Sequence, residues 1–250
     1  MAEVLTTHAL TKRYKEKIAL DGLSISVEEG HIYGLVGANG AGKTTLMRIL
    51  AGLSEPTSGS FSLFGGETSA ALCRARRRVG FLVDRPLAVE YFSIRKNLEM
   101  QARLLGGVDR EKQKELCRKL ELTERKVGRR CYSDCVLWER QRYGVAAALL
   151  GEPELLVLDE PMNGLDPEGI QAARELLEER NRSGGVTMLI ATTQPEEVRG
   201  LATDYLFLCE GRLLAQMTAA ELEEKLETEG AEAFASLLSP AVVKEGGERV

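Results

Sequence analysis

The sequence lacks any apolar run long enough to cross a membrane as a helix. The longest candidate, residues 145–150, is followed at once by Gly151, Glu152 and Pro153, whereas a membrane helix needs about 20 apolar residues. The first residues carry no apolar segment of the kind found in signal peptides. These absences predict a cytoplasmic protein that reaches a membrane only through a partner.

The chain also has few histidines and cysteines and no excess of basic residues. The chain has 2 histidines and 5 cysteines, and a zinc site at Cys131 and Cys135 would need further ligands, so we expect reduced thiols. With 33 Lys and Arg against 38 Asp and Glu, no nucleic-acid partner is expected. A local cluster, Arg74 and residues 76–78, fits a solvated surface beside a strand, with contact to anionic lipid headgroups as the sharper alternative.

What the chain does contain is apolar residues in regular patterns. A length of 250 residues with 44% hydrophobic residues suits one domain with a core. Residues 3–30 alternate apolar and polar, which predicts antiparallel strands with one face toward water. Residues 58–84 predict a further strand pair with Gly65 and Gly66 at its turn.

The pattern becomes helical between about residues 93 and 150. Strands and helices alternate again from residue 154, and residues 186–191 and 205–208 predict central strands. The segment from about residue 218 predicts a surface helix, with an end that frays from Gly246.

Residues 37–44 match the phosphate-binding loop pattern G-x-x-x-x-G-K-[ST] at every fixed position. An apolar strand is predicted before the loop and a helix after it, so backbone N–H groups and the helix dipole would meet an anion. Lys43 is expected to reach the β- and γ-phosphates, and the Thr44 hydroxyl to ligate Mg²⁺. The predicted nucleotide-binding residues of the loop are Gly37, Ala38, Asn39, Gly40, Ala41, Gly42, Lys43, Thr44 and Thr45.

A second motif is the apolar run at residues 155–158, which ends in Asp159 and Glu160. Taken alone, it is a common buried strand with acidic residues at its exit. The carboxyl ends of parallel strands open into the ligand crevice, so together with the loop it predicts that Asp159 holds Mg²⁺, through water. Glu160 is then placed to polarise the water that attacks the γ-phosphate. The two motifs predict binding of ATP or GTP with Mg²⁺.

With these motifs the chain resembles the ATP-binding subunits of ABC transporters. Residues 10–14 and 19–24 look like the family's opening strands, and residues 163–167 look like its D-loop. Residues 153–167 read as a near-continuous match. The resemblance implies that Tyr14 stacks on adenine. Among subfamilies, the chain looks most like the single-domain ATPases of drug, lantibiotic or other ABC-2-type exporters.

The resemblance covers about residues 3–220 and implies an α/β fold of the P-loop NTPase type. A mixed, mostly parallel sheet flanked by helices is expected, with an N-terminal antiparallel β subdomain and a helical subdomain at about residues 85–150. A single ATP-binding domain would span residues 1–220, and residues 221–250 would form a helical tail. Two such chains, identical or not, would close around two ATP molecules. Polytopic membrane subunits would dock on residues 84–105 and hold the chain on the cytoplasmic face of the membrane.

Three segments depart from the family pattern. The first is the signature ahead of Gln141, where Val136 and Trp138 replace a serine and a glycine if the segment is counted back from Gln141. Counted forward from Tyr132, Ser133 is kept, but about three residues are inserted and the glycine is still missing. A shifted but working signature also remains open.

The other departures are single residues. Thr193 stands where the family has its switch histidine, and threonine offers a hydroxyl but no imidazole. Asp84 replaces the Q-loop glutamine, and we expect it to keep a contact with the metal while changing the coupling. Loss of one oriented donor costs about 10²–10³ in rate, so weakened hydrolysis is expected.

Two functions follow. The leading one is an ATPase subunit that drives export, with Glu160, Lys43 and Thr193 in the catalytic site. The alternative is a subunit that binds ATP with little hydrolysis and pairs with a more typical cassette. A soluble cassette of DNA repair is a remote third, because no coiled-coil insertion or basic stripe supports it. The transported substrate is not readable from this sequence.

Overall fold

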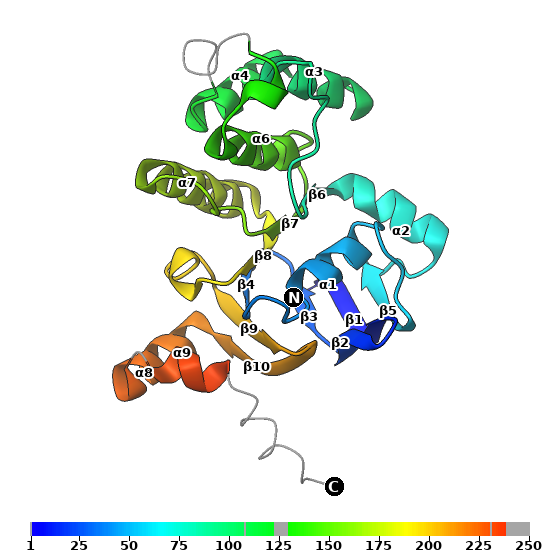
Figure 1. Cartoon of the computed structure of the whole chain (residues 1–250), viewed down its shortest axis with the longest axis vertical. Helices are drawn as coiled ribbons and strands as arrows, with labels where there is room; N and C mark the ends of the chain where they lie inside the picture. Colours follow the sequence, from blue (N-terminus) through cyan, green and yellow to red (C-terminus); the bar gives the residue numbers. More distant parts are fainter. Residues whose placement is uncertain (1, 108, 123–129, 231, 239–250) are drawn as a thin grey trace, which may run out of the picture.

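Two β-sheets that pack against a shared core form the centre of the molecule (Figure 1). The computed structural model describes residues 2–107, 109–122, 130–230 and 232–238. The larger sheet has the strand order β10 (Arg212–Thr218), β9 (Asp204–Cys209), β4 (Ile32–Val36), β8 (Thr187–Thr192), β7 (Leu155–Asp159) and β6 (Val79–Leu82). In the smaller sheet, the long strand β1 (Glu3–Tyr14) pairs with β2 (Lys17–Leu23), β3 (Ser26–Glu28) and β5 (Ser58–Leu63).

Five strands of the larger sheet run parallel, and β10 is antiparallel to β9. Every residue of β4, β7 and β8 is buried, as expected for a parallel sheet that is covered on both faces. Alternate side chains enter two cores. Leu35 of β4 packs with α1 (Lys43–Leu50) and the smaller sheet, while Val36 packs with α6 (Leu137–Leu149) and α7 (Pro167–Gly184). The predicted mixed, mostly parallel α/β fold is confirmed.

The smaller sheet is antiparallel throughout, which confirms the expectation for residues 3–30. The strand pair predicted at residues 58–84 is wrong. β5 pairs with β1 of the smaller sheet, β6 pairs in parallel with β7, and α2 (Ser69–Ala75) lies between them. The hydroxyl of Thr68 caps α2 by accepting a hydrogen bond from the Ala71 N–H. The prediction assigned Gly65 and Gly66 to a hairpin turn, but this cap and the burial of Leu72 favour a helix after β5.

The arginine cluster begins in the last turn of α2 and continues after it, and it contacts the protein itself at two positions. Arg76 Nε donates to the Leu50 carbonyl oxygen at 2.7 Å, at the end of α1. Arg78 pairs with Glu154 and lies 3.7 Å from the centre of the Phe64 ring. Contact of this cluster with anionic lipid stays a prediction.

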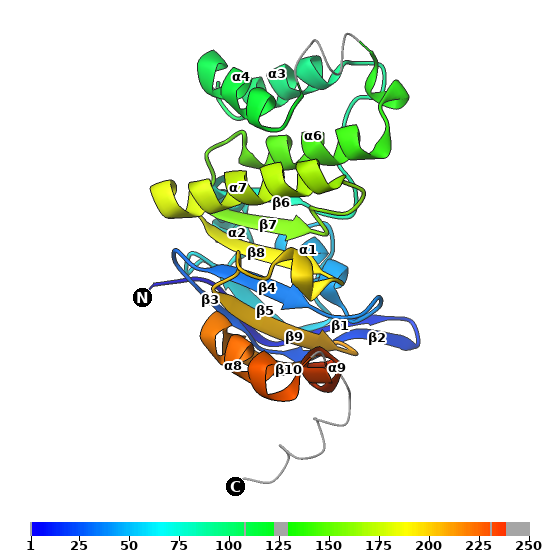
Figure 2. The ribbon, with the colours of Figure 1, turned by 90° about the vertical axis from the view of Figure 1, so that its left-hand side faces the viewer.

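In the part of residues 93–150 that the structure describes, the predicted helical region contains α3 (Ile94–Leu104), α4 (Arg110–Lys119) and α6. Ser93 caps α3 by accepting from the Lys96 N–H, and Ile94, Leu98 and Ala102 are buried on one side of α3, as their spacing predicts. Figures 1 and 2 show this helical subdomain at one end of the molecule. Among the described residues, no helix is both long and apolar enough to span a membrane.

The opposite end carries α8 (Ala219–Glu229) and α9 (Glu232–Leu237) (Figure 2). Thr218 caps α8, and Leu222 is buried in the same core as Tyr205 of β9. The helix predicted from about residue 218 is therefore confirmed, and it packs on the sheet. The fraying predicted from Gly246 lies outside the described residues, and the domain boundary at residue 220 stays a prediction.

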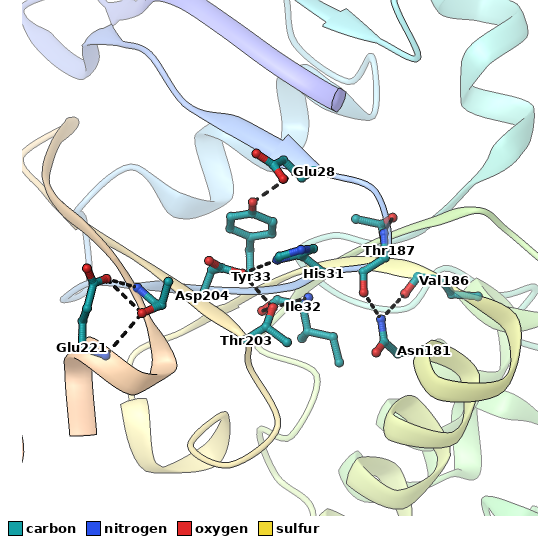
Figure 3. A network of polar contacts seen from close by, with 12 residues as sticks. Glu28, His31, Ile32, Tyr33, Asn181, Val186, Thr187, Thr203, Asp204 and Glu221 are labelled. Carbon is teal, nitrogen blue, oxygen red and sulfur yellow. Dashed lines mark hydrogen bonds and ion pairs between the residues drawn. The ribbon is translucent and has the colours of Figure 1, made fainter. Parts of the chain in front are cut away.

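Polar side chains join the amino ends of the parallel strands (Figure 3). Asn181 at the end of α7 donates to the Gly30 carbonyl oxygen at 2.7 Å, and the Gly30 N–H donates to the Thr187 hydroxyl at 2.9 Å. The Thr203 hydroxyl accepts from the Ile32 N–H at 2.9 Å. These hydrogen bonds hold the starts of β4, β8 and β9 in register, so the carboxyl ends of these strands meet at the opposite edge.

Candidate functional site

The phosphate-binding loop leaves β4 at Val36 and enters α1 at Lys43. Neighbouring strands fix it on both sides: the Gly37 N–H donates to the Thr192 carbonyl oxygen at 3.3 Å, and the Gly211 N–H donates to that of Ala41 at 2.8 Å. Gly42 has φ +111°, and a Cβ there would lie 2.5 Å from the Ala19 carbonyl oxygen. Only glycine fits such a position. The strand, loop and helix predicted from the sequence are thus present.

Lys43 is buried at the start of α1, with 6% of its side chain exposed. Its ammonium group donates to the carbonyl oxygens of Gly37 at 2.6 Å and Ala38 at 3.3 Å. The distance from Nζ to Glu160 Oε1 is 3.8 Å. Burial lowers the pKa of Lys43, while the charges of Glu160 and Asp159 partly offset this effect. The ammonium group therefore lies over the loop, near Asp159 and Glu160, the two acidic residues predicted for the site.

Asp159 ends β7 and is 6% exposed. Burial raises its pKa, and hydrogen bonds from the Thr44 hydroxyl and the Asp84 backbone lower it. Among the described residues, its Oδ1 is one of two buried side-chain atoms without a hydrogen-bond partner. An orphaned carboxylate oxygen beside a hydroxyl fits Mg²⁺, a hard cation that takes oxygen ligands. The structure thus brings the predicted ligands Thr44 and Asp159 together.

Glu160 follows Asp159 with its backbone in the left-handed region, at φ +48°. Its N–H donates to the Ala191 carbonyl oxygen at 2.9 Å, and its own carbonyl accepts from the Gln141 side chain at 2.8 Å. Burial raises the pKa of Glu160, whereas Lys43 and a hydrogen bond from the Thr193 backbone lower it. These contacts hold the carboxylate beside the loop, and they place Thr193 next to it at the end of β8.

The positions of Tyr14 and Asp84 correspond less directly to their predicted roles than those of the loop residues do. Tyr14 ends β1 with 42% of its side chain exposed, and its hydroxyl lies 3.4 Å from Ser54 Oγ. Asp84 follows β6, and both of its carboxylate oxygens accept hydrogen bonds from Arg48, at 2.8 and 2.6 Å. Its predicted contact with the metal therefore stays a prediction, and Arg48 is a residue that the sequence reasoning missed.

The altered signature segment begins α6. Leu137 is the first helical residue, and Val136 and Leu137 are 47% and 65% exposed. The buried carboxylate of Glu139 accepts a hydrogen bond from the Val136 N–H at 3.0 Å and pairs with Arg130. Two apolar side chains and an internal carboxylate thus occupy the helix end that binds an anion in many proteins. The local signal for this cap was half of a capping box, because Glu139 stands three residues after the cap position but that position holds Val136 and not Ser or Thr.

The segment predicted to be the D-loop connects β7 to α7. Asp166 caps α7, and its Oδ1 accepts hydrogen bonds from the Gly169 N–H at 3.1 Å and from Arg142 at 3.0 Å. Leu137 lies over Gly164, since a Cβ on this glycine would come within 2.8 Å of Leu137 Cδ2. The start of α6 and the loop after Glu160 therefore form one continuous surface.

Comparison with known proteins extends this geometry. A sequence profile of the ABC transporter family matches residues 20–163. The bacitracin transport ATP-binding protein BcrA of Enterococcus faecalis is 36% identical over 225 residues, which are 90% of this chain and 72% of that protein. The lantibiotic transport ATP-binding protein SrtF of Streptococcus pyogenes is 35% identical over 85% of this chain and 90% of its own.

A solved dimeric ATP-binding cassette, bound to ADP and Pi in a post-hydrolysis state, has the same fold. It superimposes with a TM-score of 0.78 over 86% of this chain and 98% of its own, at 23% identity. The predicted resemblance and fold are confirmed by these similarities. The chain therefore belongs to the ABC transporter family, as one of its ATP-binding subunits.

Proposed function

We propose that this chain binds Mg-ATP at the carboxyl ends of β4, β7 and β8 and hydrolyses it. The observation that carries this proposal is the convergence of a buried ammonium group, an orphaned carboxylate oxygen and a second carboxylate at one loop. Lys43 would leave the loop carbonyls for the β- and γ-phosphates, because phosphate oxygens are stronger acceptors. The stacking of Tyr14 on adenine remains part of the proposal.

In hydrolysis, a water oxygen attacks the γ-phosphorus, and the bond from this phosphorus to the β–γ bridging oxygen breaks. Glu160 orients the water and takes its proton. The pKa of Glu160 is raised by burial, which suits a base that must hold a proton transiently. Thr193 would offer a hydroxyl near the γ-phosphate. Thr44 and Asp159 would hold Mg²⁺, which would supply positive charge beside the phosphates.

Coupling to transport is proposed through the outer surface of the helical subdomain. Leu87, Tyr91 and Leu104 are 78%, 74% and 81% exposed, and large exposed apolar side chains are candidates for contact with a partner. They fall within or beside the predicted docking segment, residues 84–105. A polytopic membrane subunit that presents an apolar segment fits this surface. The chain would then lie on the cytoplasmic face of the membrane and drive export, as the similarity to antibiotic transport proteins suggests.

A second candidate function is a subunit that binds ATP with little hydrolysis. The capped start of α6 favours it, because the Glu139 carboxylate, which pairs with Arg130, already takes up the Val136 N–H at the helix end that the phosphate of a partner's ATP would approach. In a dimer of two identical chains, both composite sites would contain this obstacle. A partner with an open signature would relieve it at one site only.

The test is steady-state Mg²⁺-ATPase activity of the purified chain and of two glutamate variants. Glu154 precedes β7 and Glu160 follows it, so Glu154→Gln is a matched control for Glu160→Gln. Turnover that survives Glu154→Gln and is lost in Glu160→Gln would support the ATPase. A turnover near zero in the unaltered chain, with ATP binding demonstrated by calorimetry, would support the second candidate. Absence of ATP binding would contradict both.

A further inference from the structure

One ion pair joins the helix after the phosphate-binding loop to the segment that leads into the helical subdomain. Arg48 lies on α1, five residues after Lys43, and Asp84 lies two residues after the end of β6. Nε of Arg48 donates to Asp84 Oδ2 at 2.8 Å, and NH2 donates to Oδ1 at 2.6 Å. Both carboxylate oxygens are therefore engaged in a parallel, two-point contact, the arrangement in which arginine fixes geometry best.

The backbone of Asp84 adds two further constraints. Its φ of +62° is in the left-handed region, which is uncommon for a residue other than glycine. Its backbone also makes a hydrogen bond that lowers the pKa of Asp159. Asp84 thus contacts α1 through its side chain and the candidate metal ligand through its backbone, at the point where the chain turns toward α3.

The ion pair is also the main electrostatic influence on Arg48. The hydrogen bond from its guanidinium group to Asp84 is the largest cause of its raised pKa, and Tyr14 adds a smaller part. Exposed ion pairs add little to stability, and here the Arg48 and Asp84 side chains are 43% and 37% exposed. The effect of such a pair is to orient Asp84 relative to α1.

We propose that Asp84 is a positioning residue held by Arg48, and not a ligand of the metal. The pair fixes the start of the segment at residues 84–93 relative to α1, and transmits occupancy of the loop to the helical subdomain. A metal contact would require Asp84 to break two charge-assisted hydrogen bonds, whereas Asp159 Oδ1 needs to break none. The transmission step rests on the proposed binding of Mg-ATP, while the positioning step does not.

The test compares Arg48→Gln, Asp84→Asn and the double variant with the unaltered chain. The double variant is neutral at both positions, so it separates a metal ligand from a charge effect on neighbouring groups. Arg199→Gln with Glu223→Gln is a matched control, because this pair is also exposed and bidentate but lies at the other side of the sheet. All variants retain a folded core, since no buried residue is changed.

The first measurement is amide hydrogen exchange without nucleotide. We expect the segment at residues 84–93 to exchange about 3- to 10-fold faster in each single variant and equally fast in the double variant, because either change breaks the whole pair. The control pair should leave this segment unchanged. Unchanged exchange in Arg48→Gln, or a double variant that exchanges faster by the product of the two single effects, would overturn the positioning role. This result does not depend on ATP binding.

The second measurement is the Mg²⁺ concentration that half-saturates ATP binding. We expect the double variant to match the unaltered chain within about threefold, and ATP to stop protecting residues 94–104 in all three variants. A tenfold higher Mg²⁺ requirement in the double variant would identify Asp84 as a ligand and overturn the proposal. Protection that persists would overturn the transmission step. If the unaltered chain binds no ATP, the proposed function fails and the exchange result without nucleotide still decides the positioning role.

Discussion

The two edges of the parallel sheet, at the amino ends and at the carboxyl ends of its strands, differ in how their polar groups are satisfied. At the amino ends, Asn181, Thr187 and Thr203 make short, satisfied hydrogen bonds to backbone groups (Figure 3). At the carboxyl ends, Asp159 keeps an orphaned buried oxygen and Glu160 has a left-handed backbone. Satisfied polar groups stabilise a fold, while unsatisfied and strained groups are retained where a ligand completes them. The carboxyl edge thus keeps acidic groups that the fold leaves incomplete. Near the amino edge, the one described buried side-chain atom without a partner is Nε of Arg180, next to Asn181.

The difference has a chemical cause in the residue types. Neutral side chains such as threonine and asparagine complete their bonds with backbone partners that the fold itself supplies. Asp159 and Glu160 carry charge into a buried region, and Lys43 is the opposite charge that acts on both of them. Burial of such charges is costly unless another group compensates. Three substitutions test this contrast, and they follow in order of expected effect.

The largest effect is expected from Gly42→Ala, which breaks the incomplete edge. The new Cβ would lie 2.5 Å from the Ala19 carbonyl oxygen, so the loop must move. We expect ATP affinity, measured by calorimetry, to fall about 100-fold, equivalent to about 2.7 kcal/mol. Gly40→Ala is the control, because Gly40 also has a positive φ of +85° but its Cβ would meet only Lys17 Nζ, at 3.9 Å. Its strain amounts to about 1 kcal/mol, and equal losses in both variants would contradict the steric explanation.

A smaller effect is expected from Asn181→Ala at the completed edge. This change removes the side-chain hydrogen bonds to the carbonyl oxygens of Gly30 and Val186. We expect the free energy of unfolding to fall by about 1–2 kcal/mol in denaturant titrations, while ATP affinity stays within about twofold. A stable variant with weakened ATP binding would reverse the roles that we assign to the two edges.

The smallest effect is expected from Asp159→Asn, and it has the opposite sign. A carboxyl group whose folded-state pKa is raised stabilises the fold below its unfolded pKa, and this contribution is lost as the pH rises through the folded-state pKa. At pH 7 the charged Asp159 therefore destabilises the chain, so the variant should be more stable by about 1 kcal/mol, a Tm rise of about 2–4 °C. The gain should vanish below about pH 3.8, the ordinary pKa of aspartate. Thermal unfolding measured over a range of pH tests this gain in stability. A variant whose Tm at pH 7 is lower than that of the unaltered chain would contradict the prediction.

Local patterns in the sequence predicted most of the nucleotide site. The phosphate-binding loop is contiguous and follows β4 directly, and β7 is a short apolar run that ends in Asp159. Contacts between residues far apart in the sequence could not be predicted from it. The pairing of Arg48 with Asp84 joins positions 36 residues apart, and β5 leaves its expected partner for β1. Such choices depend on which surfaces meet after folding, and alternation of apolar residues does not encode them.

Glu139 is an intermediate case. Its capping bond is local, three residues from Val136, and the glutamate half of the capping pattern was readable. Its ion pair with Arg130 is also close in sequence. What the sequence could not reveal is that the apolar residues at this helix end remain exposed beside Gly164.

The most direct test of the contrast between the two edges is amide hydrogen exchange with and without Mg-ATP, read at both edges in one experiment. We predict protection at residues 37–45 and 159–160, and no change at residues 28–31, 181–187 and 203–204. Protection spread evenly over both edges would contradict the account, because the completed edge would then also respond to the ligand. Protection confined to the amino-end residues would place the nucleotide at the wrong edge of the sheet.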